Sequence, residues 1–288
     1  MISKPTLSGT LTMLMLLLGG CFPGFSESKL ATEPPERFTY EARLSALRDG
    51  MPATPHLISA IRGGVEDAPR VIYVHGTPGE SGGFSRYITN PLEGFESIAI
   101  DRPGFGQTRP AGSVVSFEQQ AAAIEPLLVE REGRWPILVG HSLGGPIVAR
   151  AAADFPDRVG GLVILAGSLD PALEDPRWFN HAAEWGLVRL IMGRILRTSN
   201  DEIMGAEEQT TMLAECLGRV RAPIRILHGT ADELVPIGNV EYMRSAFEDV
   251  DRLHIRVIEG EGHFLPWRRE DEVREAIRGL ADEIVRTE

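Results

Sequence analysis

The stretch WPILVGHSLGGPIVARAAADF, residues 135 to 155, decides how this chain is read. An apolar run at 136 to 139 stops abruptly at a segment rich in glycine and resumes as an Ala-rich pattern with helical spacing. A strand followed at once by a helix, with a very short turn between them, explains that change of pattern. Ser142 lies in the turn, and the question is whether it is presented there as a nucleophile.

Glycines stand two positions before and two positions after the serine, at Gly140 and Gly144. In a sharp strand-to-helix turn, a Cβ atom at either position would collide with the neighbouring strand or helix. Pro146 suits the first turn of the helix, where its missing N–H costs least. The pattern predicts that Ser142 is a nucleophile on such a turn, and a structural serine in a glycine-rich connection is the alternative.

Short apolar runs alternate with helical patterns along the rest of the chain. Six runs are typical of strands, several of them apolar at consecutive positions as in strands covered on both faces: 71–74, 97–100, 137–139, 162–165, 224–227 and 255–258. Four segments have helical spacing: 117–129, 146–154, 237–247 and 270–286. The alternation predicts an α/β fold with helices on both faces of the sheet.

One region interrupts this alternation. Between the strand that ends near Leu165 and the one that begins near Pro223, no strand-like run occurs, and residues 185 to 196 have helical apolar spacing. A loop of that length without structure is uncommon. We therefore expect a small helical insertion at 171–217, between core segments 38–170 and 218–288.

The composition is that of an ordinary globular protein. The chain has 288 residues, 43% hydrophobic and 24% charged, with a formal net charge of −12. Binding to nucleic acid phosphates needs clustered Lys and Arg, and the sequence has no basic tract. We expect no nucleic-acid partner.

The N-terminal segment is typical of export. Lys4 precedes an apolar run at 11–18 that is too short to span about 30 Å of hydrocarbon as a helix. Leu18-Gly19-Gly20-Cys21 resembles the lipobox of bacterial lipoproteins, which implies a signal peptide at 1–20, a lipidated Cys21 and a polar tether at 21–37. A plain signal peptide or an uncleaved anchor is the alternative.

The residue after Cys21 and the number of cysteines indicate which membrane and which disulfides to expect. Phe22 rather than Asp follows the cysteine, which by the same resemblance favours the outer membrane if the source is Gram-negative. Cys216 is the second of two cysteines, so a lipidated Cys21 leaves no intramolecular disulfide.

A nucleophilic serine needs a base, and His263 is the best candidate among seven histidines. It lies in Glu-Gly-Glu-Gly-His-Phe, residues 259–264, just after the last predicted strand and therefore at the carboxyl edge of the sheet. The other six are expected near strand starts, beside glycines at strand ends, on the far side of the serine turn, or in the insertion: His56, His254, His75, His228, His141 and His181.

The base in turn needs an acceptor that holds its tautomer. Asp232, in His-Gly-Thr-Ala-Asp-Glu at 228–233, follows the penultimate predicted strand and falls in the loop beside that of His263. An aspartate after a strand often only caps a turn. Asp170, after the preceding strand, is the rival candidate, and Glu233 is a weaker one.

Acyl transfer also needs N–H donors for a developing oxyanion. The backbone N–H of Leu143, at the start of the predicted helix, is one candidate. The second should come from His-Gly-Thr-Pro-Gly at 75–79, where Pro78 has no N–H and Thr77 is the remaining candidate. A Gly-Pro turn without a catalytic role is the alternative.

Taken together, these motifs resemble the α/β-hydrolase fold family over about residues 40 to 288. The resemblance rests on the order Ser142, Asp232, His263 and on five segments: HGTPG at 75–79, DRPGFGQT at 101–108, GHSLGG at 140–145, HGTADELVP at 228–236 and GEGHF at 260–264. It implies a mostly parallel eight-stranded sheet, a helical cap at about 171–217 and a Ser-Asp-His triad. A serine nucleophile disfavours the haloalkane dehalogenase and epoxide hydrolase branches, whose chemistry requires a carboxylate.

The resemblance leaves several substrates open. Prolyl aminopeptidases usually carry HGGPG where this chain has Thr77 in place of the second Gly, and they need acidic cap residues for a substrate ammonium. The acidic candidates in the insertion are Glu184, Asp201, Glu202, Glu207 and Glu208. Carbon–carbon bond hydrolases are a further serine branch.

An apolar lining of the cap favours an ester over a charged substrate. The residues expected to line the substrate site are Trp178, His181, Trp185, Met192 and Phe264. We therefore expect a carboxylesterase or lipase-like enzyme acting through an acyl-enzyme, with a small-molecule ester as its substrate. It would need no metal and no cofactor. A lipid-anchored binding or scaffold module on the same fold is the alternative without activity.

Overall fold

A computed structural model describes residues 35–44 and 54–285 of the chain. The predicted signal peptide, Cys21 and most of the predicted tether lie outside these residues. Among the helices that are described, none is both long enough and apolar enough to cross a membrane.

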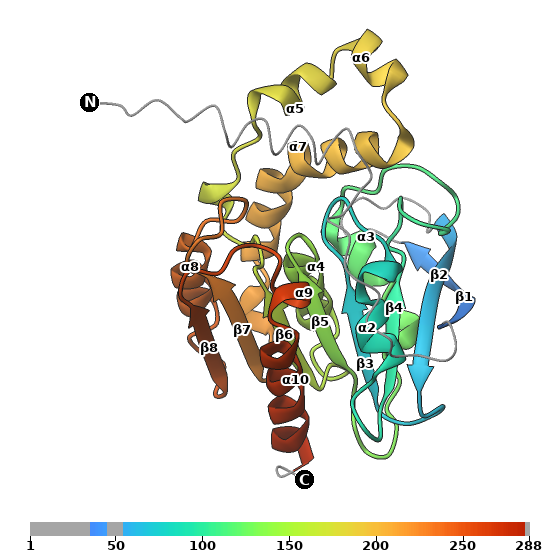
Figure 1. Ribbon diagram of the computed structural model, residues 1–288, viewed down its shortest axis with the longest axis vertical. Helices are drawn as coiled ribbons and strands as arrows, with labels where there is room; N and C mark the ends of the chain where they lie inside the picture. The colour runs from blue at the N-terminus through green and yellow to red at the C-terminus, as the bar shows by residue number, and fades with distance from the viewer. Residues whose placement is uncertain (1–34, 45–53, 286–288) are drawn as a thin grey trace. The chain divides into compact units, whose positions relative to one another are not determined.

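Eight strands form one sheet in the order β1-β2-β4-β3-β5-β6-β7-β8 (Figure 1). β1 and β2 pair antiparallel, as do β2 and β4, and all the other neighbours are parallel. The strands are β1 Glu36–Leu44, β2 Thr54–Gly64, β3 Arg70–Val74, β4 Glu96–Ile100, β5 Ile137–His141, β6 Gly161–Leu165, β7 Ile224–Gly229 and β8 Leu253–Ile258. The predicted α/β-hydrolase architecture and all six predicted strands are confirmed.

Helices cover both faces of the sheet, which explains strands that are apolar at consecutive positions. Alternate residues of β3 belong to two separate buried clusters: Ile72 and Val74 to one, Val71 and Tyr73 to the other. The first cluster includes residues of α3 Phe117–Ala122, α4 Gly144–Asp154 and α8 Gly238–Ala246. The second includes residues of η1 Ser81–Phe84, α2 Ser85–Thr89, α9 Leu265–Arg268 and α10 Glu270–Val285.

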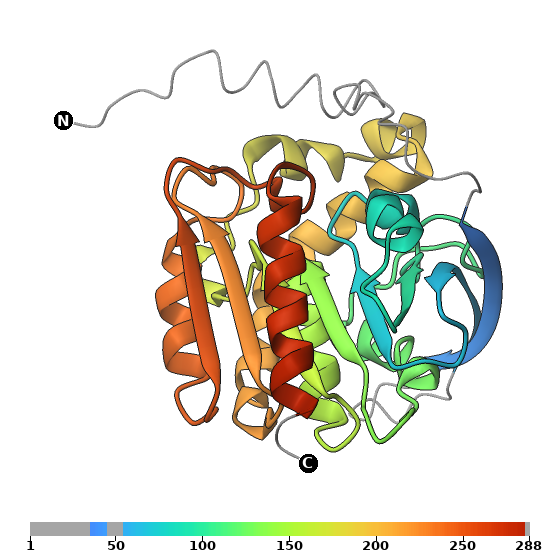
Figure 2. The ribbon, with the colours of Figure 1, turned by 60° about the horizontal axis from the view of Figure 1, so that its bottom comes forward.

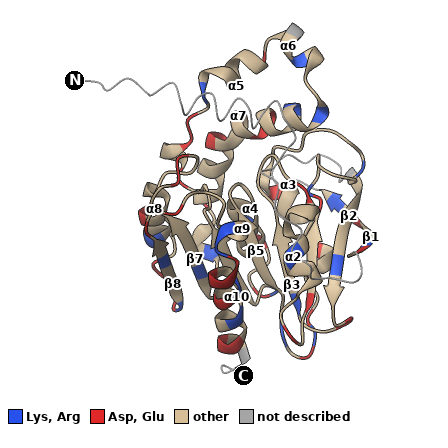
Figure 3. Ribbon diagram, in the orientation of Figure 1, with Lys and Arg blue, Asp and Glu red and all other residues tan. Residues whose placement is uncertain are grey.

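The last helix, α10, lies along the sheet as its sequence pattern predicts (Figure 2). Val273, Ile277 and Leu280 form one buried stripe. Leu280 packs so closely on β6 that a Cβ atom at Gly161 would lie 2.7 Å from its side chain. Many charged residues occupy the other positions of the helix, including three carboxylates in its first turn (Figure 3), where they complement the helix dipole.

The segment between β6 and β7 is helical and contains no strand (Figure 1). Its elements are η3 Pro171–Leu173, α5 Trp178–Ala183, α6 Gly186–Ile191, α7 Arg194–Ala214 and η4 Leu217–Arg219. α7 is the long member and contributes Ala206 and Leu213 to the core under α4. The helical segment thus ends at Arg219, two residues beyond the predicted end, and we call residues 171–219 the insertion from here on.

Two boundaries differ from those expected from the sequence. β1 begins at Glu36, two residues before the expected core boundary, because Arg37 pairs with Asp101 at 2.8 Å and so ties the strand to the core. The single helix expected over 117–129 is broken: α3 ends at Ala122, and a short 3-10 turn, η2 Glu125–Leu127, follows. Pro126 in that turn has no N–H to continue the α-helical hydrogen bonds.

Candidate active site

Ser142 lies in the turn between β5 and α4, with a left-handed backbone φ of 55°. A Cβ atom at Gly140 would lie 2.3 Å from the Gly144 carbonyl oxygen, and one at Gly144 would lie 2.2 Å from that of Val74. Only glycine fits at these two positions. The Ser142 N–H donates to the Leu165 carbonyl at 2.9 Å, which fixes the turn against β6.

The loops after β7 and β8 are bonded to each other, and this brings Asp232 to His263. The Ala231 N–H donates to the Glu261 carbonyl at 2.9 Å, and the Gly260 N–H donates to Thr230 Oγ1 at 2.8 Å. His263 Nδ1–H then donates to Asp232 Oδ2 at 2.8 Å, and both side chains are buried. The bond leaves His263 Nε2 as the nitrogen able to accept a proton.

Asp232 is held in its charged form. Burial acts to raise the pKa of its carboxyl, but the hydrogen bond and charge of His263 and the amides of Val235 and Leu234 outweigh burial and lower it. Those two amides donate to Asp232 Oδ1 at 2.8 and 2.9 Å. Oδ1 of the carboxylate therefore accepts hydrogen bonds from the loop backbone, and Oδ2 accepts the hydrogen bond from His263.

The serine turn and the histidine loop meet through His141. Its Nε2–H donates to the His263 carbonyl at 2.9 Å, and the two imidazole rings lie 4.8 Å apart between centroids. No hydrogen bond joins the Ser142 hydroxyl to His263, although both residues are described. Such bonds are often long in unliganded enzymes and tighten on substrate binding.

The loop after β3 packs directly against the serine. A Cβ atom at Gly76 would lie 2.7 Å from Ser142 Cβ and 3.2 Å from its Oγ. Thr77 follows Gly76, and among the described residues its buried Oγ1 has no hydrogen-bond partner. Leu143 stands at the N-terminus of α4, where backbone N–H groups lack helical partners. Leu143 thus follows Ser142 in sequence, while Thr77 follows Gly76, the residue that abuts Ser142 in space.

Comparison with known proteins gives the family. The model of the alpha/beta hydrolase fold family matches residues 69–213, half of the chain. The protein belongs to the α/β-hydrolase fold family. A hydrolase of Pseudomonas named for 2-hydroxy-6-oxononadienedioate and 2-hydroxy-6-oxononatrienedioate is 24% identical over 72% of this chain and 86% of its own length.

Two further likenesses cover different shares of this α/β-hydrolase. An esterase of Mycobacterium tuberculosis is 36% identical over 38% of the chain and 36% of its own length. The crystal structure of the monoacylglycerol lipase of Paleococcus ferrophilus superposes with a TM-score of 0.62 at 24% identity, over 78% of this chain and 98% of that one. With several curated relatives, the match spans only 29% to 36% of the relative's length.

The rival acids lie elsewhere in this α/β-hydrolase. Asp170 Oδ1 accepts the Ala172 N–H at 2.9 Å and so caps η3. Glu233 is exposed beside the buried Asp232. Of the three acids considered, Asp232 is the one that contacts His263.

Two histidines were placed wrongly from the sequence. His56 is near the start of β2, but β2 runs antiparallel to β4, so its start extends past Ile100 at the carboxyl edge of the sheet. His141 was expected on the far side of the serine turn, yet it contacts the backbone of His263. Both errors arise because sequence does not show strand direction or the close approach of distant loops.

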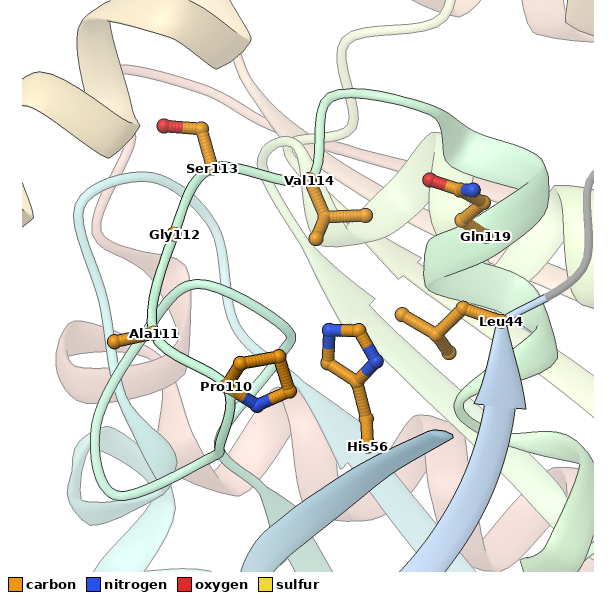
Figure 4. Close-up of a pocket in the computed structure, with 8 residues that line it drawn as sticks. All are labelled: Leu44, His56, Pro110, Ala111, Gly112, Ser113, Val114 and Gln119. Atoms are coloured by element: carbon orange, nitrogen blue, oxygen red, sulfur yellow. The ribbon is translucent and has the colours of Figure 1, made fainter. Parts of the chain in front are cut away.

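His56 lines a cavity of about 220 Å³, together with Leu44, Gln119 and the loop 110–114 (Figure 4). Its imidazole points between Leu44 and Pro110 in the close-up. Ser142, Asp232 and His263 are not among the lining residues. Within the described chain, no cluster of three or more His, Cys, Asp and Glu side chains is arranged to hold a metal ion.

The expected substrate-lining residues are spread over the insertion and the His263 loop. Trp178 and Trp185 are 73% and 69% exposed, His181 is also exposed and Met192 is half-buried. Phe264 lies beside His263, with ring centroids 5.7 Å apart at a steep angle. Phe264 is therefore the expected lining residue that contacts a candidate catalytic side chain.

Three of the five acidic candidates in the insertion form ion pairs with arginines. Glu184 and Asp201 both pair with Arg189, at 3.1 and 2.6 Å. Glu202 is buried and pairs with Arg102 at 2.6 Å. Glu207 and Glu208 are exposed on α7. None of the three paired carboxylates is left to bind a substrate ammonium.

Two residues near the site escaped the sequence analysis. Trp267 packs its ring on His141, 5.2 Å between centroids, while its Nε1–H donates to the Gly83 carbonyl at 2.8 Å. Glu261 is held by Arg268 and Arg269 at 2.8 and 2.7 Å, just before the His263 turn. A short helix directly after His263, α9, was the feature of the sequence that could have pointed to both residues.

Proposed function

We propose that this protein is a serine hydrolase that cleaves a carboxylic ester through an acyl-enzyme. The observation that carries the proposal is the Asp232–His263 hydrogen bond, in loops that also contact the turn of the left-handed Ser142. A buried imidazole held by a carboxylate, close to a half-buried turn serine, is the arrangement that activates a hydroxyl.

The reaction proceeds in two steps. His263 Nε2 takes the Ser142 proton as Oγ attacks the ester carbonyl, and the N–H groups of Leu143 and Thr77 donate to the resulting oxyanion. The alkoxide leaves with the proton from His263. A water molecule deprotonated by His263 then attacks the acyl-serine, which releases the acid and restores Ser142.

The ester assignment rests on two lines of support. One relative is named as an esterase and one structural neighbour as a lipase. The ion pairs of Glu184, Asp201 and Glu202 leave them unsuited to a substrate ammonium, which disfavours a prolyl aminopeptidase. A second candidate is hydrolysis of a 2-hydroxy-6-oxo-dienedioate, because the Pseudomonas relative aligns over 72% of the chain.

Labelling with a fluorophosphonate tests the nucleophile. Wild type and the surface control Ser245→Ala should be labelled, and Ser142→Ala should not. Labelling that persists in Ser142→Ala would reject Ser142, and a folded wild type that takes no label would favour the binding-module alternative.

Turnover assays separate the substrates. We expect Ser142-dependent hydrolysis within a series of p-nitrophenyl esters of increasing chain length, and none of proline-β-naphthylamide. Preference for the naphthylamide would reverse the ranking of the esterase and aminopeptidase hypotheses.

A further inference from the structure

Arg102 is a wholly buried arginine that follows β4 and binds the loop beside Ser142. Its Nε–H donates to the His75 carbonyl at 2.8 Å, and its Nη2 donates to the Gly76 carbonyl at 2.9 Å. These carbonyls belong to consecutive peptide groups of the loop after β3. One side chain therefore fixes the orientation of two peptide planes in that loop.

His75 adds a second N–H donor to the Gly76 carbonyl. The backbone N–H of Arg102 donates to His75 Nε2 at 3.2 Å, so the proton of the neutral ring is on Nδ1, which donates to the Gly76 carbonyl at 2.7 Å. Burial, assisted by the charge of Arg102, lowers the pKa of His75 to about 3. The ring stays neutral, and the Gly76 carbonyl receives two N–H groups.

The Gly76 carbonyl shares a planar trans peptide with the Thr77 N–H. In such a group the C=O and N–H bonds point in opposite directions. A carbonyl held toward Arg102 and His75 therefore directs the Thr77 N–H away from them. Because Gly76 abuts Ser142, that N–H belongs to the part of the loop next to the nucleophile.

Glu202 on α7 holds the arginine in place. Arg102 Nη1 donates to Glu202 Oε1 at 2.6 Å and Nη2 donates to Oε2 at 3.0 Å, a bidentate pair in which both side chains are at most 1% exposed. Gln120 Nε2 also donates to Glu202 Oε1, at 3.2 Å. A buried pair of this kind is costly to desolvate and is weak evidence for a role in stability alone.

We propose that the Arg102–Glu202 pair fixes the orientation of the Gly76–Thr77 peptide so that the Thr77 N–H can donate to the oxyanion. Because Glu202 lies on α7, the pair also connects the insertion to this oxyanion donor. The inference rests on the proposed function of the site. Arg102 and Glu202 touch no reacting atom in it and act through the peptide that they orient.

The test uses the full chain with the double variant Arg102→Met/Glu202→Leu. Replacing a buried ion pair with apolar residues of similar size often preserves folding. Glu202→Gln, which keeps the side-chain shape, is the second variant if the double variant does not fold. Glu96→Gln is the matched control, since Glu96 is equally buried and pairs with Arg70 at 2.7 Å at the opposite edge of the sheet.

Two measurements separate positioning from simple damage: kcat and KM on a p-nitrophenyl ester, and the inhibition constant of a trifluoromethyl ketone, which forms an oxyanion adduct with a serine. We expect kcat/KM and ketone affinity to fall together by about 10- to 100-fold with KM nearly unchanged. This is less than the roughly 10²–10³-fold loss for removal of an oxyanion donor, because the Thr77 N–H would be misplaced and not removed. Glu96→Gln should stay within about threefold of wild type.

The inference is overturned if a folded variant keeps its ketone affinity, or if Glu96→Gln loses as much. If Ser142→Ala hydrolysed the ester as fast as wild type, the proposed function would be overturned and this inference with it. Turnover that depends on Ser142 but not on Arg102 and Glu202 would remove only the inference.

Discussion

Ser142 occupies a backbone region that an L-residue adopts only when its surroundings impose it. Its φ of 55° is fixed by two bonds, from its own N–H to Leu165 and from the Gly145 N–H to its carbonyl at 2.8 Å. Non-glycine residues held in this region cost about 1–3 kcal/mol, and such strain is concentrated at functional sites. This strain accompanies the placement of a half-buried serine directly after the buried strand β5.

This strain predicts a difference between two inactive variants. Ser142→Gly should be more stable than Ser142→Ala by about 1 kcal/mol, because glycine accepts a positive φ without a steric penalty. Urea unfolding of both proteins measures the difference. Equal stability, or a more stable alanine variant, would mean that the turn stores no strain.

Asp232 orients His263, so its amide analogue should impair turnover far more than it alters folding. We expect Asp232→Asn to lower kcat by about 10³–10⁴-fold, because an amide in place of the carboxylate can favour the wrong histidine tautomer. Asp170→Asn is the control, since Asp170 only caps η3. An equal loss in Asp170→Asn would contradict the assignment of the acid.

The buried histidines predict how stability depends on pH. Burial, with a smaller effect of the His263 charge, lowers the pKa of His141 to about 3, and His75 has a similar value. Unfolding restores an ordinary pKa of about 6.5, so the unfolded chain binds more protons between these values. The free energy of unfolding should therefore decline as the pH falls from about 6.5 toward 3.

The contribution of one ring can be measured directly. Each histidine contributes a slope of about 1.4 kcal/mol per pH unit within that window. His141→Gln retains an N–H for the His263 carbonyl and should flatten the slope between about pH 6 and pH 4 by about that amount, whereas the exposed control His181→Gln should leave it unchanged. A slope in His141→Gln identical to wild type would show that His141 is not buried in its neutral form.

Among the elements, α10 is fixed by one stripe whose contacts cross to β6. Leu280 is fully buried and lies against Gly161. Leu280→Ala should lower the free energy of unfolding by about 2–5 kcal/mol, through lost burial and the cavity that remains. Arg278→Ala on the exposed side of the helix should change it by less than about 0.5 kcal/mol. Chemical denaturation compares the two, and similar losses would be inconsistent with this packing.

The insertion differs from the core in what it buries. α7 carries buried polar side chains, among them Thr198, Asn200 and Glu202. Trp178 at the start of α5 and Trp185 at the N-cap of α6 stay exposed. Apolar spacing identified the helices of this segment. It did not show which of their faces is covered, because Asn200 bonds Asn180 of α5 and Glu184 at its C-cap, while Glu202 bonds Arg102, one hundred residues away.

At the scale of the whole molecule, parallel strands bring the candidate site together. β3, β5, β7 and β8 all end at one edge of the sheet, and the loops that follow them carry Thr77, Ser142, Asp232 and His263. This is the edge where ligands bind in open α/β sheets. The charge of the chain, −12, adds no attraction for nucleic acid.

Anchoring remains a proposal about the N-terminal segment, which lies outside the described residues. If Cys21 carries lipid, Cys21→Ser should move the protein from the membrane fraction to the soluble fraction, because lipid chains supply the membrane affinity. Fractionation and metabolic labelling with a palmitate analogue measure this, with Cys216→Ser as the control. Membrane retention of unlabelled Cys21→Ser would argue for an uncleaved anchor instead.

Residue patterns predicted six of the eight strands and the local requirements of the site, and the resemblance to the family implied the eight-stranded sheet. Buried parallel strands are apolar over their whole length, and turns such as Gly140–Gly144 admit only certain residues, so both are legible residue by residue. β1 and β2 were not predicted individually, because they lie at one side of the sheet and β1 buries only some of its residues. Ser142, Asp232 and His263 were nominated from strand ends, and their catalytic roles stay predictions.

Only the tertiary structure decided which side chains meet. His56 lies at the carboxyl edge because β2 runs antiparallel to β4. His141 donates to the His263 backbone, and Glu202 pairs with Arg102, one hundred residues away. Local patterns report the burial and backbone geometry of a segment, but a hydrogen bond between distant loops depends on strand order and direction. The stretch at 135–155 therefore predicted a nucleophile, while the fold determined which side chains surround it.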